Sequence, residues 1–334
     1  MKKISIGLIG AGHLGSIHLK LLRASDSFSF EGVFDTSAKV REKLRQEEGL
    51  RVFETYEELL SSVEAVDIVT PTIHHFACAK QAIEAGKHVF IEKPLTHTLE
   101  EAEQLLDLLA ARPRLKAQVG HVERFNPGFL AIAGHQIKPM FIEGHRLAIY
   151  NPRGTDVSVV FDLMIHDIDI VLSVVDSPLK SVQASGVGVI SDSTDIANAR
   201  LEFENGAVAN LTASRISVKN MRRLRMFQRN TYLAVDFLEK KAEVFRLSDT
   251  AGGLSEGSMS FPLDNGDETR YLVFEQPQSP PVNSIQLELE EFAGAIRDQS
   301  PIKVGIEAGY LALKAAHAIA LKIEESLANA RTWE

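Results

Sequence analysis

The sequence is poor in cysteine, lacks long apolar runs and has no excess of positive charge. Its one cysteine, Cys78, allows no disulfide within the chain, which is typical of proteins from a reducing compartment. No stretch approaches the roughly 18 uninterrupted apolar residues that a membrane-spanning helix needs. The net charge is -9 with His neutral. This acidic balance argues against nucleic acid or an anionic membrane as a partner.

The first residues look briefly like a secretory signal peptide, because two lysines precede an apolar run. Gly10, Gly12 and His13 interrupt that run, and no small-residue cleavage site follows. We therefore expect a cytoplasmic protein. Its 334 residues exceed what one compact core usually holds, so we also expect two domains.

The first part of the chain alternates short apolar runs with amphipathic segments. The apolar runs occupy residues 4–9, 28–34, 65–69, 88–91 and 115–119, and helical patterns occupy residues 14–24, 37–48, 75–85 and 98–110. Strands that alternate with helices form a parallel sheet covered on both faces. The sequence therefore predicts an α/β chain whose residues 1–120 form a Rossmann dinucleotide-binding domain.

The pattern changes after residue 120. Helical patterns are expected at residues 124–135, 156–175, 283–298 and 305–327, and strands at 139–148, 180–190, 196–204, 207–215, 221–228, 231–237 and 242–247. Residues 248–268, rich in Ser, Gly and Asp, are expected to form a loop. This predicts an α+β domain over residues 121–334 with an open, mainly antiparallel sheet, and a C-terminal helix that packs back on the first domain. One free sheet face makes a homo-dimer or homo-tetramer plausible.

A glycine-rich motif joins the first predicted strand to the first helix. Its residues are Gly10, Ala11, Gly12, His13, Leu14 and Gly15. Asp35 ends the second strand about 20 residues later, which completes the context of a dinucleotide-binding fingerprint. The helix N-terminus, with His13 and Leu14, offers N–H groups to a pyrophosphate. Asp35 should accept hydrogen bonds from ribose hydroxyls, so NAD is favoured over NADP, although Lys39 and Arg41 lie near it.

Polar residues follow the next two strands, where ligands bind in open parallel sheets. Thr70 and Pro71 end one strand, and Glu92 and Lys93 end the next, just before a proline. We expect them at the nicotinamide half of the dinucleotide, with Lys93 placed to bond a substrate hydroxyl. The alternative is an exposed loop lysine before a turn proline. His74 is counted among the cofactor contacts, although packing at a helix start explains it as well.

The predicted helix at 156–175 carries Asp162 and His166, four residues apart and so on one face. A carboxylate there can orient the imidazole of a general base. A purely structural pair and a metal site that includes Asp169 are the alternatives. One histidine among carboxylates does not match a closed zinc site, so no metal is expected.

Together these motifs resemble the glucose-fructose oxidoreductase and inositol dehydrogenase family, often called Gfo/Idh/MocA. The likeness extends over nearly the whole chain and includes residues 301–319. It implies a Rossmann domain that binds NAD(P) and a sheet domain that often mediates oligomers. It also implies that Lys93, Asp162 and His166 are catalytic. A ring C–H then gives hydride to nicotinamide, His166 takes the hydroxyl proton, and Lys93 stabilises the alkoxide.

A narrower likeness lies in residues 120–127, GHVERFNP. This segment resembles the subgroup of UDP-N-acetylglucosamine 3-dehydrogenases. The likeness implies oxidation of the 3-hydroxyl of that sugar nucleotide or a related one. Substrate contacts are then expected from Lys93, Asp162, His166, Arg124, Asn126 and Arg153. A diphosphate also needs cations, for which Arg146, Arg153, Arg215 and Lys219 are equal candidates.

Two other functions stay open at this stage. One is a dehydrogenase of a free sugar or of inositol. The other is a non-catalytic regulator that keeps the dinucleotide site. The presence of Lys93, Asp162 and His166 favours an enzyme, because a regulator has no need of a proton-transfer pair.

Overall fold

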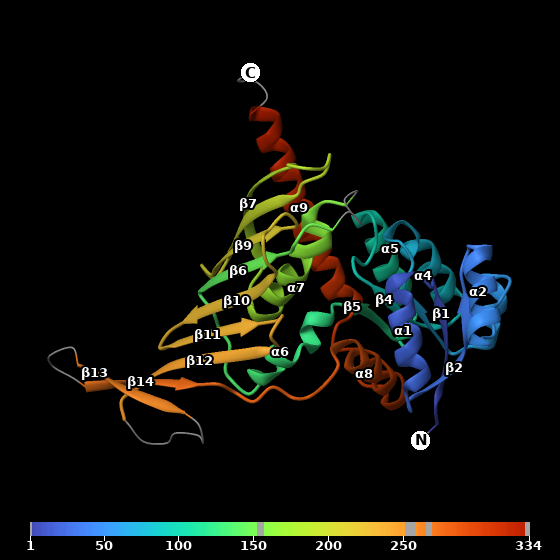
Figure 1. Cartoon of the computed structure of the whole chain (residues 1–334), viewed down its shortest axis with the longest axis horizontal. Helices are drawn as coiled ribbons and strands as arrows, with labels where there is room; N and C mark the ends of the chain where they lie inside the picture. The colour runs from blue at the N-terminus through green and yellow to red at the C-terminus, as the bar shows by residue number, and fades with distance from the viewer. Residues whose placement is uncertain (1, 152–156, 251–257, 265–268, 331–334) are drawn as a thin grey trace. The chain divides into compact units, whose positions relative to one another are not determined.

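The computed structural model describes residues 2–151, 157–250, 258–264 and 269–330 (Figure 1). The chain divides into two compact units. The first unit contains Met1–Val122 and Val282–Leu313, and the second contains Glu123–Pro281 and Lys314–Glu334. The first unit thus includes a segment from late in the chain, Val282–Leu313. The sequence instead predicts domains of residues 1–120 and 121–334.

The first unit is built on a five-stranded parallel sheet with the order β2-β1-β3-β4-β5. Its strands are β1 (Ile4–Ile9), β2 (Phe28–Phe34), β3 (Ala65–Ile68), β4 (His88–Glu92) and β5 (Ala117–Gly120). All five were predicted from their apolar runs. Because the strands are parallel, their carboxyl ends meet at one edge of the sheet.

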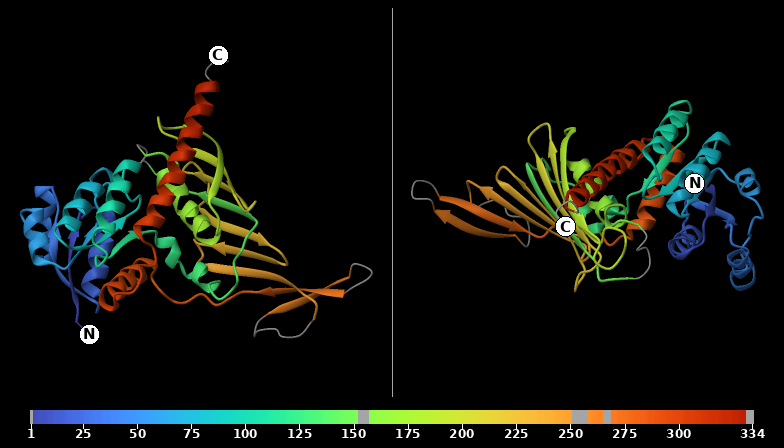
Figure 2. Two further views of the ribbon diagram at one scale, coloured as in Figure 1. Left: turned by 180° about the vertical axis from the view of Figure 1, so that it is seen from behind. Right: turned by 90° about the horizontal axis from the view of Figure 1, so that it is seen from above.

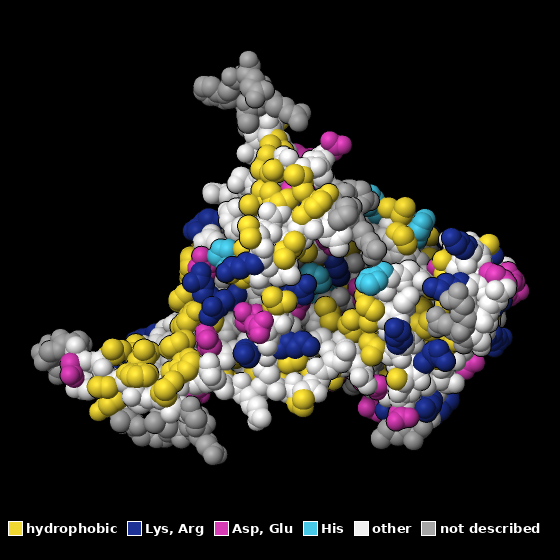
Figure 3. Space-filling view, viewed as in Figure 1, with side chains coloured by type: hydrophobic (Ala, Val, Ile, Leu, Met, Phe, Trp, Pro, Cys, Tyr) yellow, Lys and Arg dark blue, Asp and Glu magenta, His cyan; other side chains and the backbone are white. Residues whose placement is uncertain are grey.

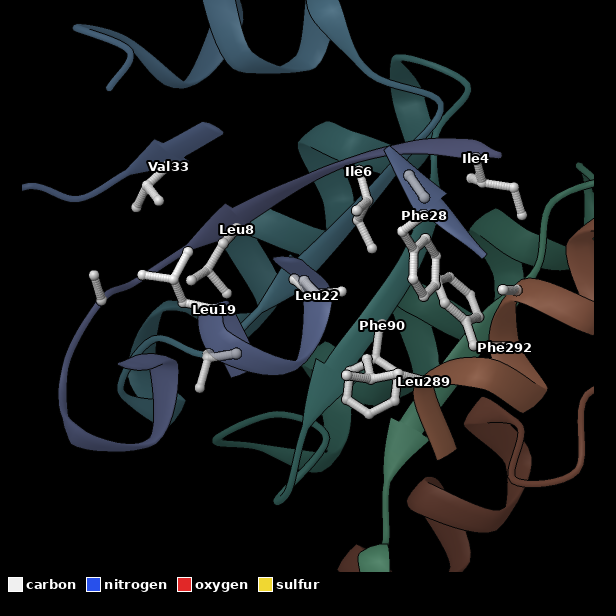
Figure 4. Packing of buried hydrophobic residues seen from close by; sticks show 14 of the residues in the cluster. Ile4, Ile6, Leu8, Leu19, Leu22, Phe28, Val33, Phe90, Leu289 and Phe292 are labelled. Atoms are coloured by element: carbon white, nitrogen blue, oxygen red, sulfur yellow. The ribbon is translucent and has the colours of Figure 1, made fainter. Parts of the chain in front are cut away.

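Helices cover both faces of this sheet. They are α1 (His13–Ala24), α2 (Ala38–Glu48), α3 (Tyr56–Ser62), η1 (Thr72–His74), α4 (His75–Glu84), α5 (Leu99–Ala110), α8 (Ser284–Asp298) and the beginning of α9 (Ile306–Ala330). On one face, Leu22 of α1 and Phe292 of α8 join Ile6 and Phe90 of the sheet in one buried cluster (Figure 4). The late segment therefore completes the core of the first unit.

Helix α3 covers part of the opposite face and was not predicted. A Cβ at Gly7 of β1 would lie 2.7 Å from Leu59 Cδ2, so the helix packs directly on this glycine. Thr55 and Glu58 form a capping box at its start. This S/T-x-x-E pattern is the signal that could have identified the helix from the sequence.

The second unit contains a nine-stranded sheet with the order β13-β14-β12-β11-β10-β6-β9-β8-β7. The strands are β6 (Phe141–Leu147), β7 (Leu179–Val187), β8 (Ile196–Phe203), β9 (Val208–Ser214), β10 (Met221–Gln228), β11 (Thr231–Asp236), β12 (Lys241–Ser248), β13 (Met259–Asp264) and β14 (Thr269–Glu275). Only β6 and β9 pair in parallel among these strands of the described residues, so the mainly antiparallel sheet is confirmed.

Strand β13 lies where a loop was predicted, and that prediction is wrong for residues 259–264. Within the part of the chain that the structure describes, the strand is at the edge of the sheet and pairs only with β14. An edge strand tolerates Pro262 and an irregular apolar pattern, because one side of its backbone needs no partner strand. Because of these features, and because its neighbours are rich in Ser, Gly and Asp, the strand could not be recognised from the sequence pattern.

One face of this sheet carries helical segments, which Figure 2 shows from behind. They are α6 (Pro127–Ala131), the π-helical turn η3 (Val160–Met164), α7 (Ile165–Val174) and the later part of α9, while the short helix η2 (Val122–Phe125) precedes α6 in the chain. Helix α6 packs on β11 and β12, and α7 packs on β6 and β9. Among the described residues, every helix is too short or too polar to cross a lipid bilayer.

Candidate active site

A cavity of about 540 Å³ opens at the carboxyl edge of the parallel sheet in the first unit. All but one of the residues predicted to bind a dinucleotide line this cavity. They are Gly10, Gly12, His13, Leu14, Asp35, Thr70, Pro71, His74, Glu92 and Lys93. The exception is Gly15, where a Cβ would lie 2.1 Å from the Gly10 carbonyl oxygen. Gly15 therefore allows close packing of α1 on the loop after β1.

The other two glycines of the motif serve the turn and the cavity. Gly10 has φ +87°, and a Cβ there would lie 2.7 Å from the Val69 carbonyl oxygen. A Cβ at Gly12, by contrast, would have no heavy atom within 4 Å apart from its neighbours in the chain. The backbone at Gly12 therefore leaves open space beside the first turn of α1. The first N–H groups of a helix have no carbonyl of that helix to bond, so they suit a phosphate in that space.

Asp35 is held rigidly at the end of β2. Its Oδ2 accepts a hydrogen bond from the Ala11 N–H at 2.9 Å, and its Oδ1 accepts one from the Ser37 N–H at 2.8 Å. Arg41 donates to the carbonyl oxygens of Asp35 and Thr36 at 2.8 and 3.1 Å. The Arg41 guanidinium thus lies beside the main chain of Asp35, whose carboxylate favours a ribose with free hydroxyls over one with a 2′-phosphate.

The ends of β3 and β4 form the opposite wall of the cavity. The Thr70 hydroxyl is buried and has no hydrogen-bond partner among the described residues, as expected for a group that waits for a ligand. The Lys93 N–H donates to Glu92 Oε2 at 3.1 Å, and the Lys93–Pro94 peptide bond is cis. Glu92 is buried, whereas Lys93 is half-buried.

These features fit a dinucleotide. The open space at Gly12 and the start of α1 would hold its pyrophosphate, and Asp35 would hold its adenosine ribose. The Thr70 hydroxyl and Lys93 lie at the strand ends where the nicotinamide half would bind.

Several cavity residues were missed by sequence reasoning. Phe34 and Thr36 flank Asp35, while Ala77 and Cys78 follow His74 by about one helical turn. These four residues could have been predicted, because two are adjacent to Asp35 and two lie about one helical turn after His74. Burial raises the pKa of the Cys78 thiol to about 11, so this cysteine is no thiolate nucleophile at neutral pH.

The second unit carries the other predicted catalytic residues. Asp162 lies in the π-helical turn η3, and His166 lies in the first turn of α7; both are half-buried. An uninterrupted α-helix was predicted here, and the structure corrects this at residues 160–164. The wider i→i+5 turn changes the angular offset between the two side chains. Such π-turns inside helices occur frequently at functional sites.

The neighbours of His166 anchor α7 to its unit. Asp167 accepts two hydrogen bonds from Arg146 of β6, at 2.7 and 3.0 Å, and Asp169 accepts two from Arg124, at 2.6 and 2.8 Å. Bidentate pairs of this kind fix geometry. Asp169 is thus part of an ion pair, and no group of metal-ligating side chains occurs among the described residues.

Asp195 steadies the chain just before the π-helical turn. Its Oδ2 accepts the N–H groups of Val189, Ile190 and Ser191 at 2.8 to 3.0 Å. Burial alone would raise the pKa of Asp195, but these hydrogen bonds lower it to about 2. The next residue back, Thr194, accepts the Val159 N–H with its carbonyl oxygen at 3.0 Å. The residue before η3 is therefore hydrogen-bonded to the loop whose N–H groups Asp195 accepts.

The structure gives two of the predicted substrate residues, Arg124 and Asn126, other partners. The Arg124 guanidinium is paired with Asp169. The Asn126 side chain is buried, caps α6 through the Gly128 N–H at 3.0 Å, and donates to Glu123 and to the Phe237 carbonyl at 2.9 Å. These contacts favour structural roles for both side chains. Arg153, the third prediction, lies outside the described residues.

Two of the candidate cations for a diphosphate, Arg146 and Arg215, are buried in contacts within the second unit. Arg146 is only 2% exposed and is bonded to Asp167 and to Glu123, the latter at 2.8 Å. Burial alone would lower the pKa of Arg146, but the two carboxylates raise it, so the guanidinium stays charged inside its ion pairs. Arg215 is buried and donates to the Val157 carbonyl. Lys219 is exposed.

The predicted catalytic residues belong to different units. Lys93 is in the first, and Asp162 and His166 are in the second. Each unit by itself supplies a rigid frame for its own residues, and their joint action stays a prediction.

Comparison with known proteins gives consistent matches. Residues 4–121 match the profile of the oxidoreductase family GFO_IDH_MocA, with an NAD-binding Rossmann fold, and residues 143–230 match its C-terminal domain. The UDP-N-acetylglucosamine 3-dehydrogenase of Acidithiobacillus ferrooxidans is 35% identical over 325 residues, which are 96% of this chain and 97% of that protein. The scyllo-inositol 2-dehydrogenase (NAD(+)) of Bacillus subtilis is 30% identical over 241 residues, 64% of this chain and 68% of that protein.

Solved structures agree with these matches. The structure of the Acidithiobacillus ferrooxidans UDP-N-acetylglucosamine 3-dehydrogenase is similar with a TM-score of 0.86 and 33% identity, and the match covers 97% of this chain and 99% of that one. An NAD-binding protein from Listeria innocua has a TM-score of 0.78 and 26% identity, with 97% and 96% covered.

Replacement of Asp35 with Ser should relax the discrimination against NADP. The loss of the carboxylate removes its repulsion of a 2′-phosphate, so we expect the NADP-to-NAD affinity ratio to rise at least about tenfold, or ~1.4 kcal/mol. Titration of the purified protein with each dinucleotide measures this ratio. The control is Asp26→Ser, which removes an exposed carboxylate that does not line the cavity. An unchanged ratio in Asp35→Ser would mean that another residue reads the ribose.

Proposed function

Because this chain belongs to the Gfo/Idh/MocA family of oxidoreductases, we propose that it oxidises a ring hydroxyl of a nucleotide sugar to a ketone, with NAD as its cofactor. The proposed substrate is UDP-N-acetylglucosamine, and the proposed position is its 3-hydroxyl.

One observation carries the choice of substrate. The similarity to the Acidithiobacillus ferrooxidans UDP-N-acetylglucosamine 3-dehydrogenase extends over 96% of this chain and 97% of that protein, whereas the similarity to the Bacillus subtilis scyllo-inositol dehydrogenase covers 64% and 68%. The segment at residues 120–127, whose sequence resembles the same subgroup, lies within the match to the Acidithiobacillus ferrooxidans protein.

The proposed chemistry uses three side chains. Bound NAD supplies the acceptor for the hydride that leaves the substrate carbon. His166 takes the hydroxyl proton, and the Asp162 carboxylate orients its imidazole. The Lys93 ammonium donates a hydrogen bond to the same oxygen and so stabilises the negative charge that develops there. The C–H and O–H bonds break as the C=O bond forms, so electrons and protons balance.

A second substrate class is favoured by a specific observation. Arg146 and Arg215, two of the four cations considered for a diphosphate, are buried in contacts within their own unit. A free sugar or an inositol carries no diphosphate and needs neither residue. The inositol dehydrogenase relative is in keeping with that alternative.

A substrate panel separates these functions. Purified protein with NAD would be offered UDP-N-acetylglucosamine, other UDP-sugars, free sugars and inositols, and the absorbance of reduced nicotinamide would be followed. We expect turnover with UDP-N-acetylglucosamine, and a ketone at C3 after borodeuteride trapping and mass spectrometry. Turnover of free sugars or inositols alone would support the second class. NAD binding without any turnover would point to a regulator.

Substitution of the proposed catalytic side chains tests the mechanism. Lys93→Met and His166→Gln should each lower kcat by about 10²–10⁴, because each removes a group that acts on the reacting oxygen. The affinity for NAD should stay near that of the wild type. Lys39→Met and His88→Gln are matched controls at positions outside the cavity, and they should keep full turnover. Wild-type kcat in either catalytic variant would remove that residue from the mechanism.

We also propose that the chain associates with copies of itself through one face of the nine-stranded sheet, the face opposite the one that carries the helical segments. An aromatic row runs across this face, formed by Phe141, Phe227, Tyr232, Phe245 and Phe274. They occupy directly paired positions on β6, β10, β11, β12 and β14, and neighbouring ring centroids are 4.7 to 5.8 Å apart. Phe141 and Phe227 are 40% and 37% exposed.

Charge supports a second copy as the occupant of this face. Beside the aromatic row, Arg225 pairs with Glu143 at 2.5 Å and Arg223 with Glu243 at 2.8 Å. The charges are neutralised within the chain, so two such faces can approach without like-charge repulsion. Figure 3 shows more apolar side chains over β13 and β14, where Met259 and Phe261 are exposed. Exposed apolar patches of this kind mark interaction sites.

Phe227→Glu should convert the assembly to monomers, because it places a charge in the middle of the aromatic row. Light scattering after size-exclusion chromatography gives the mass in solution. Leu321→Glu on α9 is the control, since it adds the same charge at an exposed leucine away from the aromatic row. A monomeric wild type, or an unchanged mass for Phe227→Glu, would contradict this assembly.

A further inference from the structure

Two buried histidines contact the segment that carries Lys93, and the proposed chemistry uses neither of them. His18 is in α1 and His75 is the first residue of α4. Both side chains are buried in the first unit. Each contacts a residue next to Lys93 in the chain, so their effect on that lysine can be followed through specific atoms.

His18 acts on the residue before Lys93. Its Nδ1 lies 2.8 Å from Asp67 Oδ2, and its Nε2 lies 3.2 Å from Glu92 Oε1. Burial alone would lower the pKa of His18, but Asp67 and Glu92 raise it well above its ordinary value. The raised pKa favours the imidazolium form, whose Nε2 lies beside the Glu92 carboxylate, and the other oxygen of that carboxylate accepts the Lys93 N–H.

The surroundings leave Glu92 little freedom. A Cβ at Gly120 of β5 would lie 2.7 Å from Glu92 Oε1, so the neighbouring strand is already in contact with this carboxylate. Glu288 of α8 is also near, and its carboxylate oxygens have no hydrogen-bond partner among the described residues. Burial and the charge of Glu92 raise the pKa of Glu288, which favours its neutral acid form. Glu92 is thus the anion that faces the cavity.

His75 acts on the residue after Lys93. Its Nδ1 lies 2.8 Å from the Pro94 carbonyl oxygen, and its Nε2 lies 2.8 Å from the Thr70 carbonyl oxygen. A neutral imidazole donates one hydrogen bond and an imidazolium donates two. Burial lowers the pKa of His75, and the two carbonyl contacts oppose this. In either form the ring lies between the ends of β3 and β4, which are the two segments that line the nicotinamide side of the cavity.

We propose that His18 and His75 are positioning residues for Lys93, which they fix through Glu92 on one side and through Pro94 on the other. This role rests on the catalytic function proposed for Lys93. A lysine side chain is long and flexible, so its ammonium can be placed only if its backbone is rigid. Misplacement of a reacting group by about 1 Å can lower a rate about 10²-fold, which is the scale of effect that these histidines would control.

His18→Gln and His75→Gln test the proposal. Each should lower kcat by about tenfold to a hundredfold while NAD affinity changes little, because the phosphate and ribose contacts are elsewhere in the cavity. The matched control is His88→Gln, at the other end of the same strand β4. Its ring accepts the Lys116 N–H at 2.9 Å, so it is also structural, but it does not line the cavity. Its kcat should equal that of the wild type.

A double-mutant cycle with Lys93→Met shows whether the histidines act through the lysine. If they do, His75→Gln and His18→Gln will not reduce the residual rate of Lys93→Met any further. If the two losses multiply, the histidines have a general structural role and the proposal is overturned. Thermal unfolding of each variant is measured alongside.

The remaining outcomes are also decisive. A variant that does not fold is replaced by Asn at the same position, and failure of all substitutions to fold would overturn the proposal in favour of a role in folding. Wild-type kcat in both Gln variants would overturn it as well. A wild-type protein that binds NAD but oxidises no substrate would remove the proposed function itself, whereas an active wild type with a multiplicative cycle removes only the role of the histidines.

Discussion

The cavity of the first unit depends on the close approach of Gly10 to the Val69 carbonyl. A Cβ at Gly10 would lie 2.7 Å from that oxygen, and the backbone has φ +87°, so only glycine fits. This contact brings the end of β1 against the end of β3 and aims the start of α1 at the space beside Gly12. The strand ends that hold Asp35, Thr70 and Lys93 are useful only because this turn leaves room between them.

Much of the fold could be predicted because the periodicity of apolar residues reports burial directly. All five strands of the parallel sheet follow from their apolar runs, since strands of a sheet covered on both faces are mostly apolar. The failures have physical causes. Helix α3 is only seven residues long, too short for a clear period. Strand β13 is at an edge and includes Pro262. The π-helical turn at residues 160–164 leaves no trace in a pattern read with a period of 3.6.

The candidate site was predictable where a residue type is demanded by backbone geometry or by place on a strand end, as for the glycines, Asp35 and Lys93. It was not predictable where the issue was a choice of partner. Arg124 and Arg146 look like ligands for a polar substrate until the structure shows Asp169 and Asp167 beside them. A sequence gives the charge of a side chain but not the distance to the opposite charge, and a buried arginine needs such a partner.

In both units, a buried carboxylate lies next in the chain to a proposed catalytic residue. Lys93 and His166 are half-buried, while one adjacent residue in each case, Glu92 or Asp167, is buried and lies against a basic side chain of another element. A buried pair is weak evidence for stability, because desolvation offsets most of the Coulomb attraction, but breaking it is strongly unfavourable. Such a pair therefore acts chiefly to hold the backbone in one place. The residue beside it, Lys93 or His166, therefore has its backbone held in one place.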